Sequence, residues 1–264
     1  MTDWRPLSGP ITAEVASRGH TDAGRHRIVL VHGFTQTGGS WKAIGERLVD
    51  DGREVVVVDL PGHGGSGGVR ADLRRSADML AQVGGPATYV GYSLGGRVCL
   101  HLALAYPDLV HSLVLIGAHP GIADADARAT RRRLDDERAA HLLEVGLPVF
   151  LDEWTAQPLF GGFDFGVEDR ARRLTNTAEG LASSLRMAGT GEQASLWPRL
   201  RELNMPVLAL AGEHDTNYAA IARQVAEAVP DGRWSLVPGA HHAAHLQRPD
   251  LVVEAIRSML VGRS

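Results

Sequence analysis

Residues 89–100 read YVGYSLGGRVCL and place one serine, Ser93, between glycines where one apolar run ends and another begins. Residues 91–95 fit the G-x-S-x-G pattern, in which the chain reverses so tightly that only small residues fit on both sides of the turn. The pattern requires a strand before the serine and a helix after it, and the apolar residues on both sides predict that arrangement. We therefore interpret Ser93 as a candidate nucleophile.

Short β-branched runs alternate with amphipathic segments along most of the chain. Strands are predicted within residues 27–33, 54–64, 87–93, 111–121, 206–215 and 233–239. Helices are predicted within residues 40–52, 94–106 and 217–229, and from Pro249 onward. Near-continuous apolar strands separated by helices indicate an α/β fold with a parallel sheet covered on both faces.

The strand pattern stops in the middle of the chain. Residues 125–146 read as one charged helix, and residues 166–189 read as one or two more. We interpret residues 119–193 as a helical cap, inserted into a core that residues 1–118 and 194–264 form together.

Composition excludes several classes of protein. The formal net charge of -4 argues against bulk electrostatic binding of nucleic acid. A single cysteine, Cys99, excludes an intrachain disulfide and suits a reducing compartment. No apolar run approaches the roughly 20 residues that span a bilayer, and residues 1–10 lack the apolar stretch of a secretory signal. The sequence therefore predicts a soluble cytoplasmic protein, either a monomer or a homodimer.

A serine nucleophile needs a base and a group that orients the base, and the chain order Ser, acid, His is typical of this fold. Asp215, in LALAGEHD, follows a predicted strand and is the candidate acid, with Glu213 as its rival. His242, in GAHHAAH, is the candidate base, because its spacing to His245 and Pro249 fits the pattern G-H-x-x-H-x-x-x-P. Its neighbour His241 remains an alternative.

Negative charge that develops during the reaction needs backbone donors. The loop after the first strong strand, VHGFTQTGG, predicts the N–H of Phe34 as one donor, and the N–H of Leu94 follows the serine as the second. The glycine-rich residues 59–68 lack the nucleotide-binding patterns, and no His, Cys and Asp spacing forms a convincing metal site. The sequence predicts no cofactor and no metal.

The segments VHGF, DLPGHGGS, GYSLGG and GEHD…GAHHAAH resemble the α/β-hydrolase superfamily over essentially the whole chain. That resemblance implies a mostly parallel eight-stranded sheet flanked by helices, with a helical cap inserted after strand six. The cap segments FLDEWTAQPLF and SLRMAGTGEQASLW, with GAHPGI, are more selective and resemble the 2-succinyl-6-hydroxy-2,4-cyclohexadiene-1-carboxylate synthases of menaquinone biosynthesis.

In that family the triad acts as a proton-abstracting base, and pyruvate leaves a small substrate that carries several carboxylates. The resemblance implies five substrate-binding residues, which are Tyr92, Arg97, Arg131, Trp154 and Arg173. Arginine suits such a substrate because its planar fork matches a carboxylate.

Alternatives remain for the cap and for the reaction. A one-residue alignment slip would exchange Arg131 for Arg132 or Arg133, and RRRLDDER could instead be a solvated helix face with pairs such as Arg132 with Asp136. The family often has lysine at the place of Asn217. The alternative function is a carboxylic-ester or C–C bond hydrolase of the same fold. A non-catalytic receptor is disfavoured, because binding alone does not require a Ser-His-Asp set.

Overall fold

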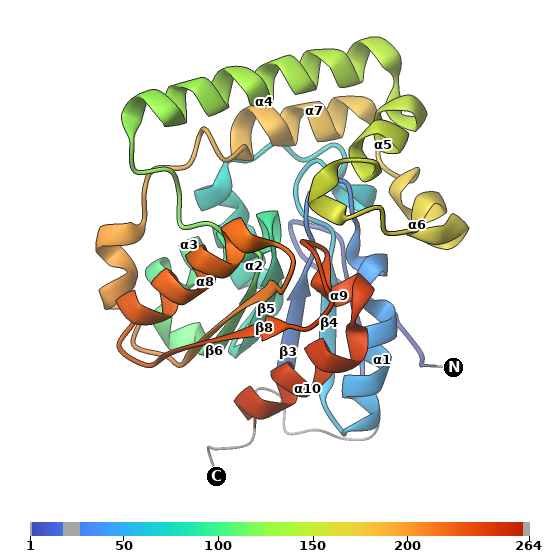
Figure 1. Ribbon diagram of the computed structural model, residues 1–264. Coiled ribbons are helices and arrows are strands. Elements are labelled where there is room, and N and C mark those ends of the chain that lie inside the picture. The colour runs from blue at the N-terminus through green and yellow to red at the C-terminus, as the bar shows by residue number, and fades with distance from the viewer. Residues whose placement is uncertain (1, 18–26, 261–264) are drawn as a thin grey trace.

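A computed structural model describes residues 2–17 and 27–260, in which one sheet carries helices on both faces and a helical cap above it (Figure 1). In their order across the sheet the strands are β1 (Arg5–Leu7), β2 (Ala13–Ala16), β4 (Glu54–Val58), β3 (Arg27–Val31), β5 (Ala87–Tyr92), β6 (Val110–Ile116), β7 (Val207–Gly212) and β8 (Gly232–Val237).

The sheet is parallel from β4 to β8, and only the N-terminal hairpin runs the other way. β2 pairs antiparallel with β4, and β1 pairs antiparallel with β2. The expected eight-stranded, mostly parallel sheet is confirmed. The hairpin itself was not predicted, because its strands have three and four residues and are too short for a clear hydrophobic pattern.

Within residues 2–17 and 27–260, six helices belong to the core and four to the cap. The core helices are α1 (Lys42–Asp50), α2 (Leu73–Gly84), α3 (Leu94–Ala105), α8 (Thr216–Ala228), α9 (Ala244–Gln247) and α10 (Pro249–Leu260). The cap helices are α4 (Ala125–Val145), α5 (Leu147–Thr155), α6 (Gly166–Arg173) and α7 (Ala178–Ala188). Short 3-10 turns are η1 (Gly38–Trp41), η2 (Gly64–Ser66), η3 (Pro107–Leu109), η4 (Pro158–Phe160) and η5 (Trp197–Glu202).

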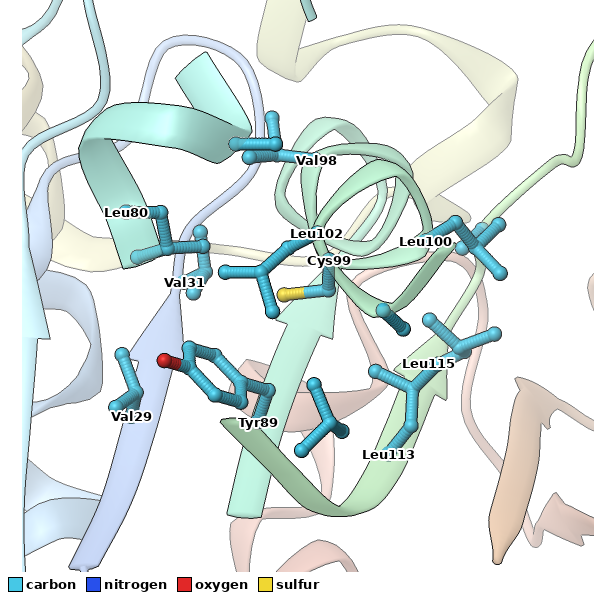
Figure 2. Close-up of a cluster of buried hydrophobic side chains, with 14 of the residues drawn as sticks. Val29, Val31, Leu80, Tyr89, Val98, Cys99, Leu100, Leu102, Leu113 and Leu115 are labelled. Atoms are coloured by element: carbon cyan, nitrogen blue, oxygen red, sulfur yellow. The ribbon is translucent and has the colours of Figure 1, made fainter. Parts of the chain in front are cut away.

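Side chains from the two faces of the sheet form two separate apolar clusters. Helices α2, α3 and α8 contribute to one cluster, whereas α1 and α10 contribute to the other. Figure 2 shows Cys99 of α3 within the first cluster, beside Tyr89 and Leu102. Burial raises the pKa of the Cys99 thiol, so this residue is a packed core side chain.

The cap lies in the chain between β6 and β7 and has a small core of its own. Ala139, Leu142, Phe150, Leu181 and Leu185 form this third cluster, in which the long helix α4 lies beside α7 (Figure 1). Phe34, in the loop after β3, packs against both the cap cluster and the α2–α3–α8 cluster. The cap is therefore seated on the loops at the carboxyl ends of the strands.

Local sequence explains where the main helices begin. An aspartate accepts a backbone N–H at the N-terminus of α2 and of α4: Asp72 accepts the N–H of Arg75, and Asp124 accepts the N–H of Ala127. Thr177 does the same for α7 through the N–H of Gly180.

Within residues 2–17 and 27–260, no helix combines the length and the apolar composition that a membrane span requires.

Candidate active site

Ser93 occupies the turn between β5 and α3, with a positive φ of 50°. A side chain at Gly91 would come within 2.6 Å of the backbone of Gly95, and one at Gly95 would come within 2.3 Å of the carbonyl oxygen of Val31. Only glycine fits at either position, because both contacts are with backbone atoms that cannot move aside. The turn thus presents Ser93 at the N-terminus of α3, as the sequence pattern predicts.

Three side chains from separate strand ends form one hydrogen-bonded line. Nδ1 of His242, which follows β8, lies 2.7 Å from Oδ2 of Asp215, which follows β7. Nε2 of His242 lies 3.2 Å from Oγ of Ser93. A proton on Nδ1 satisfies Asp215 and leaves Nε2 to accept the proton of the serine hydroxyl. This arrangement can activate Ser93 or hold a proton taken from a bound molecule.

The rivals of the acid and of the base lie elsewhere. Glu213 accepts the backbone N–H of Gly239 at 2.9 Å, in the turn after β8. The ring of His241 lies 5.0 Å from the ring of His214. The structure therefore brings Asp215 and His242 to the serine, and it leaves Glu213 and His241 in the loops beside them.

Two backbone donors flank the serine. Gly33 packs so closely on the elbow that a side chain there would lie 2.6 Å from the ring of Tyr92 and 3.5 Å from Cβ of Ser93. Among the described residues, the N–H groups of Phe34 and Leu94 have no hydrogen-bond partner. Both are available to an oxyanion beside Ser93.

A cavity of about 250 Å³ opens above Ser93 and brings together every predicted substrate-binding residue. Its lining includes Tyr92, Arg97, Arg131, Trp154 and Arg173 together with Ser93 and His242. One side of the cavity comes from strand ends and the other from the cap helices.

Arg97 is buried in the first turns of α3 and is 7% exposed. Its Nη1 donates to the carbonyl oxygen of Ala188 at the end of α7, at 2.7 Å. Burial lowers the pKa of Arg97 to about 10, which leaves the guanidinium charged at neutral pH. A buried charge of this kind is stabilised when an anion joins it.

The three consecutive arginines of α4 point in different directions. Arg131 lines the cavity, and its Nε donates to Asp135 at 2.8 Å. Arg132 pairs with Glu192 at 2.5 Å, and Arg133 donates to the hydroxyl of Thr130 at 3.1 Å.

The surface pair expected as an alternative does not form. Asp136 binds Arg186 of α7 at 2.7 Å, so it is not the partner of Arg132. Both residues form bonds that connect α4 to other parts of the cap, because α7 and the segment after it lie alongside this face of the helix. Of the three arginines, only Arg131 is placed to meet a ligand above Ser93.

Arg173 ends α6 and is 2% exposed. Its Nε donates to Asp169 at 2.5 Å, its Nη1 donates to the hydroxyl of Thr35, and its guanidinium lies 4.8 Å from the ring centre of Phe165. These contacts fix the guanidinium at the edge of the cavity.

Aromatic rings from both the cap and the core line the cavity beside these arginines. Trp154 of α5 lies 5.0 Å from Phe34 and stacks on Phe150 at 6.0 Å. Tyr92 and Tyr218 flank the imidazole of His242, at 5.3 Å and 4.5 Å between ring centres. Burial raises the pKa of both tyrosines, so neither phenol ionises at neutral pH.

Sequence reasoning missed several residues that line the cavity. Asp135 is 2% exposed and accepts from Arg131, from Arg138 at 3.3 Å and from the N–H of Gly191. Other lining residues that were not predicted include Gln36, His119, Gln157, Ser184, Thr190 and Tyr218. Helical spacing places Asp135 on the face of Arg131, but the sequence does not show which face the cavity meets.

Three other histidines organise loops. Nδ1 of His32 donates to the carbonyl oxygen of Gly33, and its Nε2 accepts the N–H of Leu60. Burial lowers the pKa of His32 to about 4 and that of His63 to about 3, so both are neutral at pH 7. His245, buried in α9, bonds to Gln36 at 3.2 Å.

In the part of the chain that the structure describes, no group of His, Cys, Asp and Glu could hold a metal ion.

Comparison with known proteins agrees with this geometry. The alpha/beta hydrolase family matches residues 28–255. A Bacillus subtilis protein provisionally named 2-succinyl-6-hydroxy-2,4-cyclohexadiene-1-carboxylate synthase is 34% identical over 249 residues, which cover 89% of this chain and 90% of that protein. The synthase of that name from Citrobacter koseri is 32% identical, over 88% of this chain and 93% of its own length.

A solved structure gives the same result in three dimensions. The structure of MenH from S. aureus superposes with a TM-score of 0.86 at 28% identity, and it covers 94% of this chain and 97% of its own. The similarity therefore includes both the core and the cap.

Proposed function

The chain belongs to the alpha/beta hydrolase family and, within it, to the 2-succinyl-6-hydroxy-2,4-cyclohexadiene-1-carboxylate synthases, and we propose that it eliminates pyruvate from a succinylated cyclohexene carboxylate in menaquinone biosynthesis. One observation carries the proposal. The line of Ser93, His242 and Asp215 opens into the same cavity as three arginines, Arg97, Arg131 and Arg173. That combination suits proton removal from a polyanion.

In the proposed reaction the triad acts as a base. Nε2 of His242 accepts the hydroxyl proton of Ser93 as Oγ takes a proton from the ring carbon next to the succinyl carbonyl. The electron pair of that C–H bond forms a new ring double bond, the double bond already in the ring shifts by one position, and the bond between the ring and the pyruvate oxygen breaks. The leaving group departs as the enolate of pyruvate, which takes up one proton, so the base is restored.

Charge that develops on the succinyl carbonyl during this step needs donors. The N–H groups of Phe34 and Leu94 have no other hydrogen-bond partner among the described residues, and we assign them as the donors to that oxygen. Asp215 keeps the imidazole in the tautomer that can accept the proton.

Binding is assigned to the arginines. The lining holds four arginines but only one carboxylate, that of Asp135, so the cavity favours an anion. Arg131 uses its Nε for Asp135 and Arg97 uses one Nη for Ala188, which leaves other guanidinium N–H groups for carboxylates of the substrate. The proposal includes a cytoplasmic monomer or homodimer that acts on a small anionic molecule.

The direct test measures the release of pyruvate from the purified succinylated cyclohexene precursor in an assay coupled to lactate dehydrogenase. We expect turnover by the wild-type protein and a parallel rise in absorbance from the conjugated diene. Rapid hydrolysis of short p-nitrophenyl esters with no pyruvate release would contradict the lyase and identify a serine hydrolase on the same triad.

A further inference from the structure

The turn that carries the Phe34 N–H contains an unfavourable backbone conformation. Among the described residues, Thr35 and Ser93 are the only non-glycine residues with positive φ, at 68° and 50°. The N–H of Gln36 donates to the carbonyl oxygen of Gly33 at 3.2 Å, so Thr35 occupies the third position of a four-residue turn. A β-branched residue with positive φ is strained, and glycine is the usual residue at such a position.

Contacts from the cap surround this strained residue. Nδ2 of Asn176, between α6 and α7, donates to the carbonyl oxygen of Thr35 at 2.9 Å and to that of Arg173 at 2.8 Å. Oδ1 of Asn176 accepts the N–H of Gly64, in the loop after β4, at 2.8 Å. The hydroxyl of Thr35 in turn accepts from Arg173.

Asn176 thus joins three segments that are far apart in the sequence. It is 5% exposed, and both its amide nitrogen and its oxygen have protein partners. A buried side chain that satisfies two carbonyl groups and one N–H is costly to replace. Strained residues at functional sites persist only when their surroundings hold them in place, and Asn176 supplies that restraint to Thr35.

We propose that Asn176 is a positioning residue: its amide, supplied by the cap, holds Thr35 in the left-handed conformation and so fixes the Phe34 N–H beside Ser93. This inference rests on the proposed function, because it assigns the Phe34 N–H to the oxyanion. The position of the oxyanion donor then depends on the contact between the cap and the loop after β3. If Thr35 relaxed to negative φ, the peptide between Phe34 and Thr35 would flip, and the loop that carries the Phe34 N–H would lose its fixed position relative to Ser93.

The kinetic test compares two variants with a matched control. Asn176→Ala removes the side-chain amide and all of its hydrogen bonds, and Asn176→Asp keeps the acceptor for the N–H of Gly64 but loses the donor to Thr35. We expect kcat for pyruvate release to fall about 10- to 100-fold in both, with KM within about threefold, because the lost term is transition-state stabilisation. The control Thr177→Ala removes the N-cap of the adjacent helix α7 without touching Thr35. Its kcat should stay within about twofold of wild type.

A second measurement does not depend on turnover. The amide of Gln36 closes the turn, so its hydrogen exchange reports whether the turn is held. We expect faster exchange of Gln36 in Asn176→Ala and Asn176→Asp, and unchanged exchange in Thr177→Ala. Wild-type kcat and unchanged Gln36 exchange in Asn176→Asp would overturn the inference, even if Asn176→Ala fails to fold.

A double variant tests the strain itself. Glycine adopts a φ of +68° without steric cost, so Thr35→Gly should reduce the effect of Asn176→Ala on kcat to about threefold or less. An equal loss of kcat in both backgrounds would contradict the role of strain. The two proposals can also fail separately. A wild-type protein that releases no pyruvate would contradict the proposed lyase activity, and the hydrogen exchange of Gln36 would still test whether Asn176 holds the turn.

Discussion

Ser93, Asp215 and His242 follow three strands of one sheet, whereas Arg131 and Arg173 belong to cap helices that no sheet aligns. Backbone hydrogen bonds fix where neighbouring strands end, so residues that follow those strands meet at one edge. Cap helices meet through side-chain packing, and a rotation by one residue exchanges a cavity residue for a surface residue. Arg131 and Arg132 illustrate this, because they are adjacent in the sequence and only the first lines the cavity.

The comparison shows that the two regions contribute different properties. The strand ends supply a base and oxyanion donors, which many reactions can use. The cap supplies Arg131, Arg173 and Trp154 to the cavity, and we propose that these side chains select the substrate. Changes at the triad should therefore affect kcat for any substrate, and changes at the cap side chains that line the cavity should affect substrate recognition. Asn176 does not line the cavity, and we expect it to act on kcat through the core loop that carries Phe34.

The largest effect is expected for the core. Ser93→Ala removes the hydroxyl that His242 contacts, and kcat for pyruvate release should fall about 1,000-fold or more. Single-turnover and steady-state pyruvate assays measure this loss. Ser183→Ala, at a half-buried position on α7 outside the cavity, is the control and should keep wild-type kinetics. A Ser93→Ala protein with more than a tenth of wild-type kcat would exclude a role for the hydroxyl in the reaction.

A smaller effect is expected for the cap arginines. Arg131→Ala removes a charged donor from the cavity and should lower kcat/KM about 10- to 100-fold, as the loss of a charge-assisted hydrogen bond implies. Arg133→Ala removes the same charge from the same helix outside the cavity and should change kcat/KM less than about twofold. Equal losses of kcat/KM in the two variants would contradict a specific contact between Arg131 and the substrate. They would show instead that the overall positive charge of the helix attracts the substrate.

The smallest effect is expected at two helix N-termini, one in each region. Asp72→Ala and Asp124→Ala each remove one capping bond and should each lower the free energy of unfolding by about 1 kcal/mol. If core and cap unfold together, both variants should lower Tm by about 2–4 °C within a single calorimetric transition. A separate transition that shifts only in Asp124→Ala would show that the cap unfolds independently.

Sequence reasoning was strongest where backbone geometry restricts the residue type. The elbow glycines could be recognised in the sequence because a side chain at Gly91 or Gly95 would collide with backbone atoms. The parallel strands could be recognised because both of their faces are buried, which requires continuous apolar runs. It was weakest where short elements depend on packing. The β1–β2 hairpin and the nine-residue helix α5 were not predicted, and the suggested pair of Arg132 with Asp136 does not form. Helix α2 was also not predicted, although it has 12 residues.

The sequence by itself determined the chain order of the six parallel strands, the turn at Ser93 and the small set of acids and histidines that could join it. The choice within that set came only from the tertiary structure, which places Asp215 and His242 in line and turns Glu213 and His241 away. The same holds for Asp135 and Asn176, whose partners lie up to 141 positions away in the chain. Local patterns record steric and hydrophobic limits on neighbouring residues, whereas a hydrogen bond between distant segments exists only once packing has brought them together.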